Sequence, residues 1–158
     1  MEALARRVGE RLKAAGEVLA TAESCTGGWA AQVVTSVAGS SAWFDRGFIT
    51  YSNAAKQEVL GVRPETLGRH GAVSEETARE MARGALERSA ATIALSITGV
   101  AGPAGGSAGK PVGTVCLAWS RGGEVHSETH RFAGDRESVR RQSVIFALEG
   151  VLKALAGG

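Results

Sequence analysis

The stretch at residues 17–28, EVLATAESCTGG, decides the fold. Its first part, residues 17–23, is an apolar run that predicts a strand, and a helix-like segment follows the turn from Trp29. The turn exposes the hydroxyl of Ser24, and the free N–H groups of the following helix offer a positive dipole to any anion formed beside it. Ser24 is therefore the first candidate for a reactive side chain.

Size and composition indicate one ordinary domain that spans residues 1–158. No apolar run reaches the about 20 residues needed to cross a bilayer, and the first residues alternate charge with apolar side chains, unlike a signal peptide. We expect a cytoplasmic protein without membrane contact. Cys25 and Cys116 match neither a disulfide framework nor a zinc site. A net charge of +2 and 5% aromatic residues argue against nucleic-acid binding.

The hydrophobic pattern predicts helices and strands that alternate along the first half of the chain. Helices are expected at residues 2–16, 29–37 and 54–60, after an N-cap at Ser74, and after an N-cap at Asp135, with strands at residues 17–23, 47–51, 92–98, 113–120 and 124–132 and a turn at residues 64–67. The early strands pair in parallel through right-handed crossovers, and Gly122 and Gly123 join the last two strands in a hairpin. The expected fold is α/β, a three-layer α/β/α sandwich with a mixed, mainly parallel sheet that ends in an antiparallel hairpin.

Three loops should meet at one edge of this sheet, because ligands bind where the carboxyl ends of parallel strands gather. They are residues 24–28, residues 51–56 and residues 98–109. The first supplies a hydroxyl and a helix N-terminus, and the second a phenol, an amide and an amine. The third is rich in glycine but matches neither the P-loop nor the dinucleotide fingerprint, so a loop without a ligand also explains it.

A serine needs a base before it can attack a carbonyl group. His126 and His130 alternate along the hairpin, which suits an exposed sheet face, and His70 lies in an irregular loop. Lys56 is the better candidate, because a lysine in a partly dry pocket can lose its proton near neutral pH.

Simpler roles for the same residues stay open. Ser24 also fits a plain helix N-cap, and Lys56 fits a solvated surface residue. Cys25 is an alternative nucleophile, because a thiol near a helix N-terminus has a lowered pKa. Three arginines at the start of the last helix could meet a phosphate or simply face solvent: Arg136, Arg140 and Arg141.

Five blocks in the same order resemble the CinA C-terminal domain family. They are residues 22–28 (AESCTGG), 44–56 (FDRGFITYSNAAK), 70–74 (HGAVS), 98–103 (TGVAGP) and 110–115 (KPVGTV). The resemblance covers nearly the whole chain. It implies the stand-alone form, without the N-terminal domain of longer members that resembles molybdopterin-binding proteins.

The resemblance implies hydrolysis of the carboxamide of nicotinamide mononucleotide to nicotinic acid mononucleotide and ammonia, with no metal or redox cofactor. Ser24 would be the nucleophile, Lys56 its base, and Tyr51 would tune or relay the proton. The residues implied to bind the substrate are Cys25, Thr26, Gly27, Gly28, Asn53, Thr98, Gly99, Gly102 and Arg140. The family tends to associate, so a homo-oligomer is expected.

Two other functions compete with this one. One is a non-catalytic nucleotide-binding module, since family members are linked by name to competence and DNA damage. The other is an amidase for a different small amide, such as a ring carboxamide without the phosphate.

Overall fold

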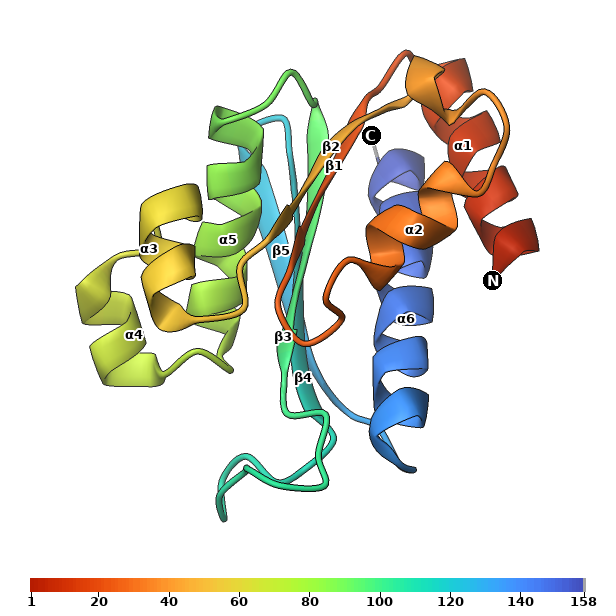
Figure 1. The fold of residues 1–158 in the computed structure, drawn as a ribbon. Coiled ribbons are helices and arrows are strands. Elements are labelled where there is room, and N and C mark those ends of the chain that lie inside the picture. Colours follow the sequence, from red (N-terminus) through yellow and green to blue (C-terminus); the bar gives the residue numbers. More distant parts are fainter. Residues whose placement is uncertain (158) are drawn as a thin grey trace.

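The computed structural model describes residues 1–157, which form a sheet with helices on both faces (Figure 1). The elements, in chain order, are α1 (Glu2–Ala15), β1 (Leu19–Glu23), α2 (Trp29–Thr35), a 3-10 turn (Ser40–Ala42), β2 (Phe44–Ile49), α3 (Asn53–Leu60), α4 (Pro64–His70), α5 (Glu75–Glu87), β3 (Ile93–Gly99), β4 (Thr114–Arg121), β5 (Glu124–Arg131) and α6 (Arg136–Ala156). None of the helices within residues 1–157 has the length and apolarity that crossing a membrane requires.

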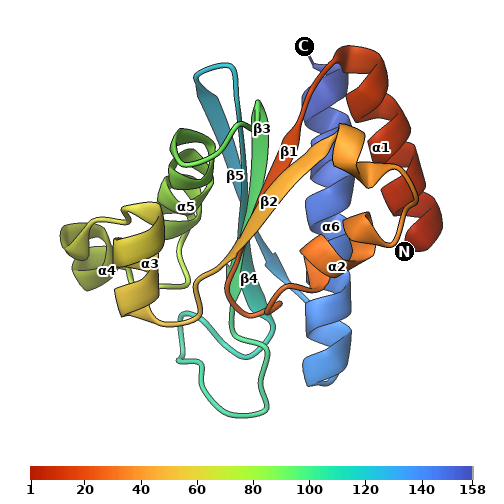
Figure 2. The same ribbon diagram turned by 45° about the horizontal axis from the view of Figure 1, so that its top comes forward.

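The sheet has the strand order β2-β1-β3-β4-β5. β1 pairs in parallel with both β2 and β3, whereas β4 is antiparallel to β3 and to β5. Helices α1, α2 and α6 cover one face, and α3, α4 and α5 lie on the other (Figure 2). The predicted α/β/α sandwich with a mixed sheet and a terminal hairpin is confirmed.

β1 lies at the centre of the sheet, and all five of its residues are buried. Alternate residues of a strand face opposite sides of a sheet. Leu19 accordingly belongs to the core cluster beneath α1, α2 and α6, whereas Ala20 and Ala22 belong to the cluster beneath α5. Burial on both faces explains why this strand reads as a continuous run of small and apolar residues. It also fixes the point at which the chain leaves the sheet, immediately before Ser24.

Two local predictions differ from the structure. β2 begins at Phe44 and ends at Ile49, so Tyr51 lies in the loop that follows rather than in the strand. The predicted turn at residues 64–67 is the first part of helix α4, which has Pro64 in its first turn. The reason is tertiary: Glu80 of α5 accepts hydrogen bonds from the Arg63 amide at 2.9 Å and from the Thr66 hydroxyl at 2.5 Å.

Gly84 lets α5 pack closely against the end of α3, the helix that carries Lys56. A Cβ atom at this position would overlap the carbonyl oxygen of Leu60. We expect Gly84→Ala to lower the free energy of unfolding by about 1–3 kcal/mol, because the two backbones must move apart. Urea denaturation measures the change.

Gly68→Ala is the matched control. Gly68 lies inside helix α4, and a Cβ there would meet no atom within 4 Å. Alanine favours the helix at such a site, so this variant should be unchanged or more stable by about 0.5–1 kcal/mol. Equal unfolding midpoints for the two variants would contradict the close packing of α3 on α5.

Candidate active site

The side chains of Ser24 and Lys56 meet in the interior of the protein. Lys56 Nζ donates a hydrogen bond to Ser24 Oγ at 2.9 Å, although the two residues are 32 positions apart in the sequence. Nζ also donates to the carbonyl oxygens of Thr50 at 2.9 Å and Tyr51 at 3.1 Å. Only 1% of Lys56 and 8% of Ser24 is exposed. Lys56 is therefore not the solvated surface residue that the sequence also allowed.

The end of β2 and the start of α3 carry Lys56 to the nucleophile. The Thr50 amide donates to the Glu23 carbonyl at 2.8 Å, which holds the chain after β2 beside the end of β1. Ser52 then caps α3, its hydroxyl accepting a hydrogen bond from the Ala55 amide at 3.0 Å. Lys56 ends the first turn of α3, and its amine reaches back to Ser24.

The surroundings of Lys56 disfavour its charged form. Burial lowers the pKa of the Lys56 amine below its ordinary value, because the ammonium has lost its water. Within residues 1–157, no carboxylate forms an ion pair with it. A buried lysine with a lowered pKa beside a serine hydroxyl has the chemistry of a general base.

Glu23, which the sequence analysis did not weigh, anchors the turn that holds Ser24. It is fully buried, and its carboxylate accepts three hydrogen bonds: from the Thr26 hydroxyl at 2.7 Å, the Ala30 amide at 2.9 Å and the Ala31 amide at 3.1 Å. The carboxylate thus ties the end of β1 to the N-terminus of α2, where negative charge is favourable. The sequence signal that could have identified Glu23 is an acidic residue at the end of an otherwise uncharged, buried strand.

We expect Glu23→Gln to lower the free energy of unfolding by about 1–3 kcal/mol, because an amide cannot accept all three hydrogen bonds and leaves a buried donor unpaired. Urea denaturation tests this. Glu10→Gln, at an exposed position of α1, removes the same charge and serves as the control. If both variants lose the same stability, the three contacts of Glu23 contribute nothing specific.

The turn after Ser24 presents free backbone donors. The Gly27 amide is bonded to the Ser24 carbonyl and the Trp29 amide to the Thr26 carbonyl, both at 3.0 Å. In the part of the chain that the structure describes, the amides of Cys25, Thr26 and Gly28 donate to no other residue. Gly28 has a φ of 103°, a conformation that favours glycine, and so does Gly27 at 57°. Cys25 and Thr26 are buried whereas Gly28 is partly exposed, so the Gly28 amide is the donor that the predicted anion-stabilising role can use.

Cys25 is an unfavourable nucleophile in this environment. It is 6% exposed, and burial raises the pKa of its thiol to about 11. The thiol is therefore protonated at neutral pH, whereas the thiolate is the reactive form. The structure favours Ser24 over Cys25.

Arginines from the start of α6 form hydrogen bonds with residues of all three loops. Arg140 donates to the carbonyl oxygens of Cys25 at 3.0 Å and Thr26 at 3.2 Å, across 115 and 114 positions of sequence, and its guanidinium stacks on Trp29. Arg136 donates to the Gly102 carbonyl at 2.7 Å and to the Tyr51 hydroxyl at 3.2 Å. The predicted convergence of the three loops is thus observed, and α6 completes it.

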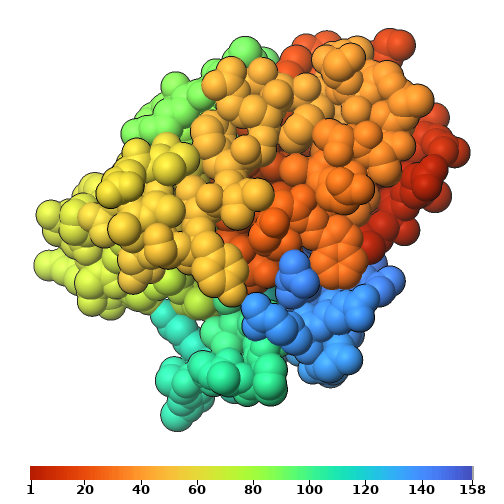
Figure 3. Space-filling view, viewed as in Figure 1, coloured from red at the N-terminus to blue at the C-terminus, as the bar shows by residue number. Residues whose placement is uncertain are grey.

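Figure 3 shows the same convergence on the surface of the molecule. The orange atoms near the start of α2, the yellow-orange atoms near the start of α3 and the blue atoms near the start of α6 adjoin, with the green-to-teal loop after β3 below them.

The other predicted site residues lie at different depths. Tyr51 is 63% exposed, and its hydroxyl contacts Arg136, while its backbone carbonyl contacts Lys56. Thr98 is buried, and its hydroxyl donates to the Ala72 carbonyl at 2.9 Å. Gly99 ends β3, and Asn53 is exposed at the first position of α3. Their roles in binding a substrate stay predictions.

Among residues 1–157, none of the three histidines forms a hydrogen bond with Ser24. His126 and His130 lie on the edge strand β5, and His70 ends α4, where its Nδ1 is 3.2 Å from Glu76. Of the titratable groups that the sequence offered as a base for Ser24, the structure brings only Lys56 to the hydroxyl.

Comparison with known proteins gives consistent relatives. The chain is 56% identical over 147 residues to the nicotinamide-nucleotide amidohydrolase PncC of Escherichia coli (strain K12). The aligned region covers 92% of this chain and 89% of the relative. It is 55% identical over 150 residues to the protein of the same name from Pseudomonas putida, with 95% and 94% covered.

A solved structure, the competence/damage inducible protein CihA from Agrobacterium tumefaciens, superposes with a TM-score of 0.94 at 51% identity, over 98% of this chain and 94% of the other. The model of the CinA C-terminal domain matches residues 1–155. The match spans nearly all of the sequence and includes both the turn of Ser24 and the loop of Lys56. The chain therefore belongs to the CinA C-terminal domain family.

Proposed function

We propose that this protein hydrolyses the carboxamide of nicotinamide mononucleotide to nicotinic acid mononucleotide and ammonia. The names of the curated relatives at 55–56% identity support this reaction. The observation that carries the proposal is the buried contact between Lys56 Nζ and Ser24 Oγ. It supplies a nucleophile and a base without a metal ion.

The hydrogen bonds of Lys56 fit both protonation states of a base. A neutral amine has two N–H donors and one lone pair. Its donors can stay on the carbonyl oxygens of Thr50 and Tyr51, while the lone pair accepts the hydroxyl proton of Ser24. When Lys56 has taken that proton, its three N–H groups have the same three acceptors.

The reaction then proceeds through an acyl-enzyme. Ser24 Oγ attacks the carboxamide carbon as Lys56 removes its proton, and the carbonyl electron pair moves onto the oxygen. The Gly28 amide at the N-terminus of α2 stabilises that oxyanion. Each such donor contributes about 3 kcal/mol in enzymes where it has been measured.

Release of ammonia completes the acyl-enzyme, and water then hydrolyses it. Lys56 gives its proton to the amide nitrogen, the C–N bond breaks and ammonia leaves. A water molecule, deprotonated by Lys56, attacks the ester carbon, and Ser24 departs with the proton restored to its oxygen. Lys56 thus acts in turn as base and acid, which a group with a pKa lowered towards neutrality does well.

Arginines of α6 would hold the phosphate of the substrate. Arg140 uses Nε and one terminal nitrogen on the turn of Ser24, and in the described part of the chain its Nη1 donates no hydrogen bond. Arg136 lies one turn earlier on the same face of α6 and donates a hydrogen bond to the Tyr51 hydroxyl. A phosphate bound there would fix the nucleotide at the mouth of the site.

The homo-oligomer and the cytoplasmic location are expectations of the same proposal.

Ammonia release by the purified protein tests the proposed function. Nicotinamide mononucleotide should release one ammonia per molecule of nicotinic acid mononucleotide, and nicotinamide riboside, which lacks the phosphate, should react much more slowly. Equal rates for the two would favour an amidase that does not recognise phosphate. Saturable binding of the nucleotide without any ammonia would favour a non-catalytic binding module.

The rate should rise with pH and then level off. Only neutral Lys56 can take the proton from Ser24, and burial puts its pKa below the ordinary value of 10.5. The midpoint of the acid limb of kcat/KM should therefore lie below that value. A pH–rate profile measures it. A rate that falls as the pH rises over the same range would exclude Lys56 as the base.

A further inference from the structure

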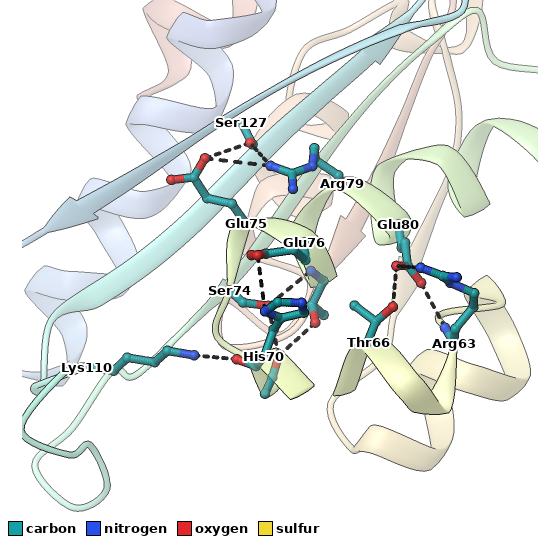
Figure 4. A network of polar contacts seen from close by, with 12 residues as sticks. Arg63, Thr66, His70, Ser74, Glu75, Glu76, Arg79, Glu80, Lys110 and Ser127 are labelled. Atoms are coloured by element: carbon teal, nitrogen blue, oxygen red, sulfur yellow. Dashed lines mark hydrogen bonds and ion pairs between the residues drawn. The ribbon is translucent and has the colours of Figure 1, made fainter. Parts of the chain in front are cut away.

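A cavity with a volume of about 540 Å³ lies where the N-terminal half of α5 faces the end of α4 and the strands β4 and β5. Neither Ser24 nor Lys56 lines it. The charged residues at its wall are Arg69, Arg79, Lys110, Arg131, Glu75 and Glu76, together with His70. Four cations against two carboxylates give the cavity an excess of positive charge. Figure 4 shows the polar contacts of five of these residues: His70, Glu75, Glu76, Arg79 and Lys110.

Both carboxylates of the cavity have polar partners within the protein. Glu75 accepts hydrogen bonds from the hydroxyls of Thr129 at 2.7 Å and Ser127 at 2.8 Å, and these hold the pKa of Glu75 below its ordinary value. Arg79 lies 3.9 Å from the same carboxylate. Glu76 faces His70 Nδ1 at 3.2 Å. Among residues 1–157, neither Glu75 nor Glu76 forms an ion pair with Arg69, Lys110 or Arg131.

Three cations of the cavity have no carboxylate partner in the described residues. Lys110 reaches from the loop before β4 to the backbone carbonyl of His70, as Figure 4 shows. Arg131 makes one long hydrogen bond, of 3.5 Å, to the carbonyl of Gly109. Arg69 forms neither a hydrogen bond nor an ion pair among residues 1–157. Neutral carbonyl oxygens do not balance the charges of these three side chains, which line the same cavity.

We propose that this cavity is a second binding site, for a small anion that carries a phosphate group, and that Arg69, Lys110 and Arg131 hold it. Guanidinium groups match the oxygens of phosphate in pairs, and the lysine adds a point charge. The volume admits a phosphate together with a small organic part. Neither Ser24 nor Lys56 lines this cavity, although Gly109 belongs to the loop after β3 that also reaches the Ser24 centre. The proposal does not depend on the amidase reaction.

Titration with inorganic phosphate and pyrophosphate at constant ionic strength tests the proposal, with amide NMR signals to locate the binding. Residues 109–114 and 129–131 should shift in the parent protein. The double variant Arg69→Gln/Arg131→Gln should raise the dissociation constant at these signals by about tenfold or more. The single variant Lys110→Gln, which leaves both arginines, should raise it by less.

Arg7→Gln/Arg11→Gln is the matched control, because it removes two exposed arginines from α1 and changes the net charge equally. It should bind as the parent does. Shifts confined to the Ser24 turn and the start of α6, an equal response to chloride, or equal affinity in all variants would overturn the proposal. Circular dichroism confirms that each variant is folded, so a failure to bind reports on the cavity.

Discussion

Ser24→Ala should lower the kcat for ammonia release from nicotinamide mononucleotide by on the order of 10⁴-fold or more. The variant has no oxygen to form the acyl-enzyme, whereas the free amides of the turn and the arginines of α6 remain. Its dissociation constant for the nucleotide should therefore change little. Steady-state kinetics and a binding titration measure the two quantities on the same preparation.

Two neighbouring substitutions separate the nucleophile from its surroundings. Cys25→Ala should keep most of the activity, because the thiol of Cys25 is buried and its pKa is raised to about 11. Ser41→Ala, at an exposed serine of the 3-10 turn, should be unaffected. If Cys25→Ala loses as much activity as Ser24→Ala, the assignment of the nucleophile is wrong.

Lys56→Met should lower kcat by on the order of 10³-fold, because methionine fills similar space but cannot take a proton from Ser24. Lys56→Arg should be no better, since a guanidinium keeps its proton in proteins. Both variants should also lose the acid limb that the parent shows in its pH–rate profile. The pH profile distinguishes a lost base from a structural disturbance, which would lower the rate at every pH alike.

The same residue predicts how stability depends on pH. The pKa of Lys56 is lowered in the folded protein, so the unfolded chain binds more protons between the lowered value and the ordinary one. The free energy of unfolding should fall as the pH drops through that window, and this dependence should be absent in Lys56→Met. Lys13→Met, at an exposed position of α1, is the control and should behave as the parent. A parent protein whose stability is level across the window would contradict the buried state of Lys56.

Local sequence determined most of the fold and the location of the site. The buried run of β1, the glycine pair after Ser24 and the glycine pair between β4 and β5 each depend on neighbours in the chain. Parallel pairing then follows from the alternation of strands and helices, and it brings the three loops to one edge of the sheet. The helical pattern of α5 and the caps at Ser74 and Asp135 were predictable for the same reason, and all three are observed.

Only the tertiary structure decided which residues far apart in the sequence are in contact. The sequence pattern predicted Lys56 as a base, but the 2.9 Å distance from its amine to Ser24 Oγ depends on how β1, the end of β2 and α3 pack together. The pKa of Lys56 depends on how much water the assembled layers exclude, which no local segment encodes. The three contacts of Glu23 and the reach of Arg140 across 115 residues are of the same kind. Sequence spacing fixes which residues share an element, whereas side-chain distance and burial arise only when the elements pack.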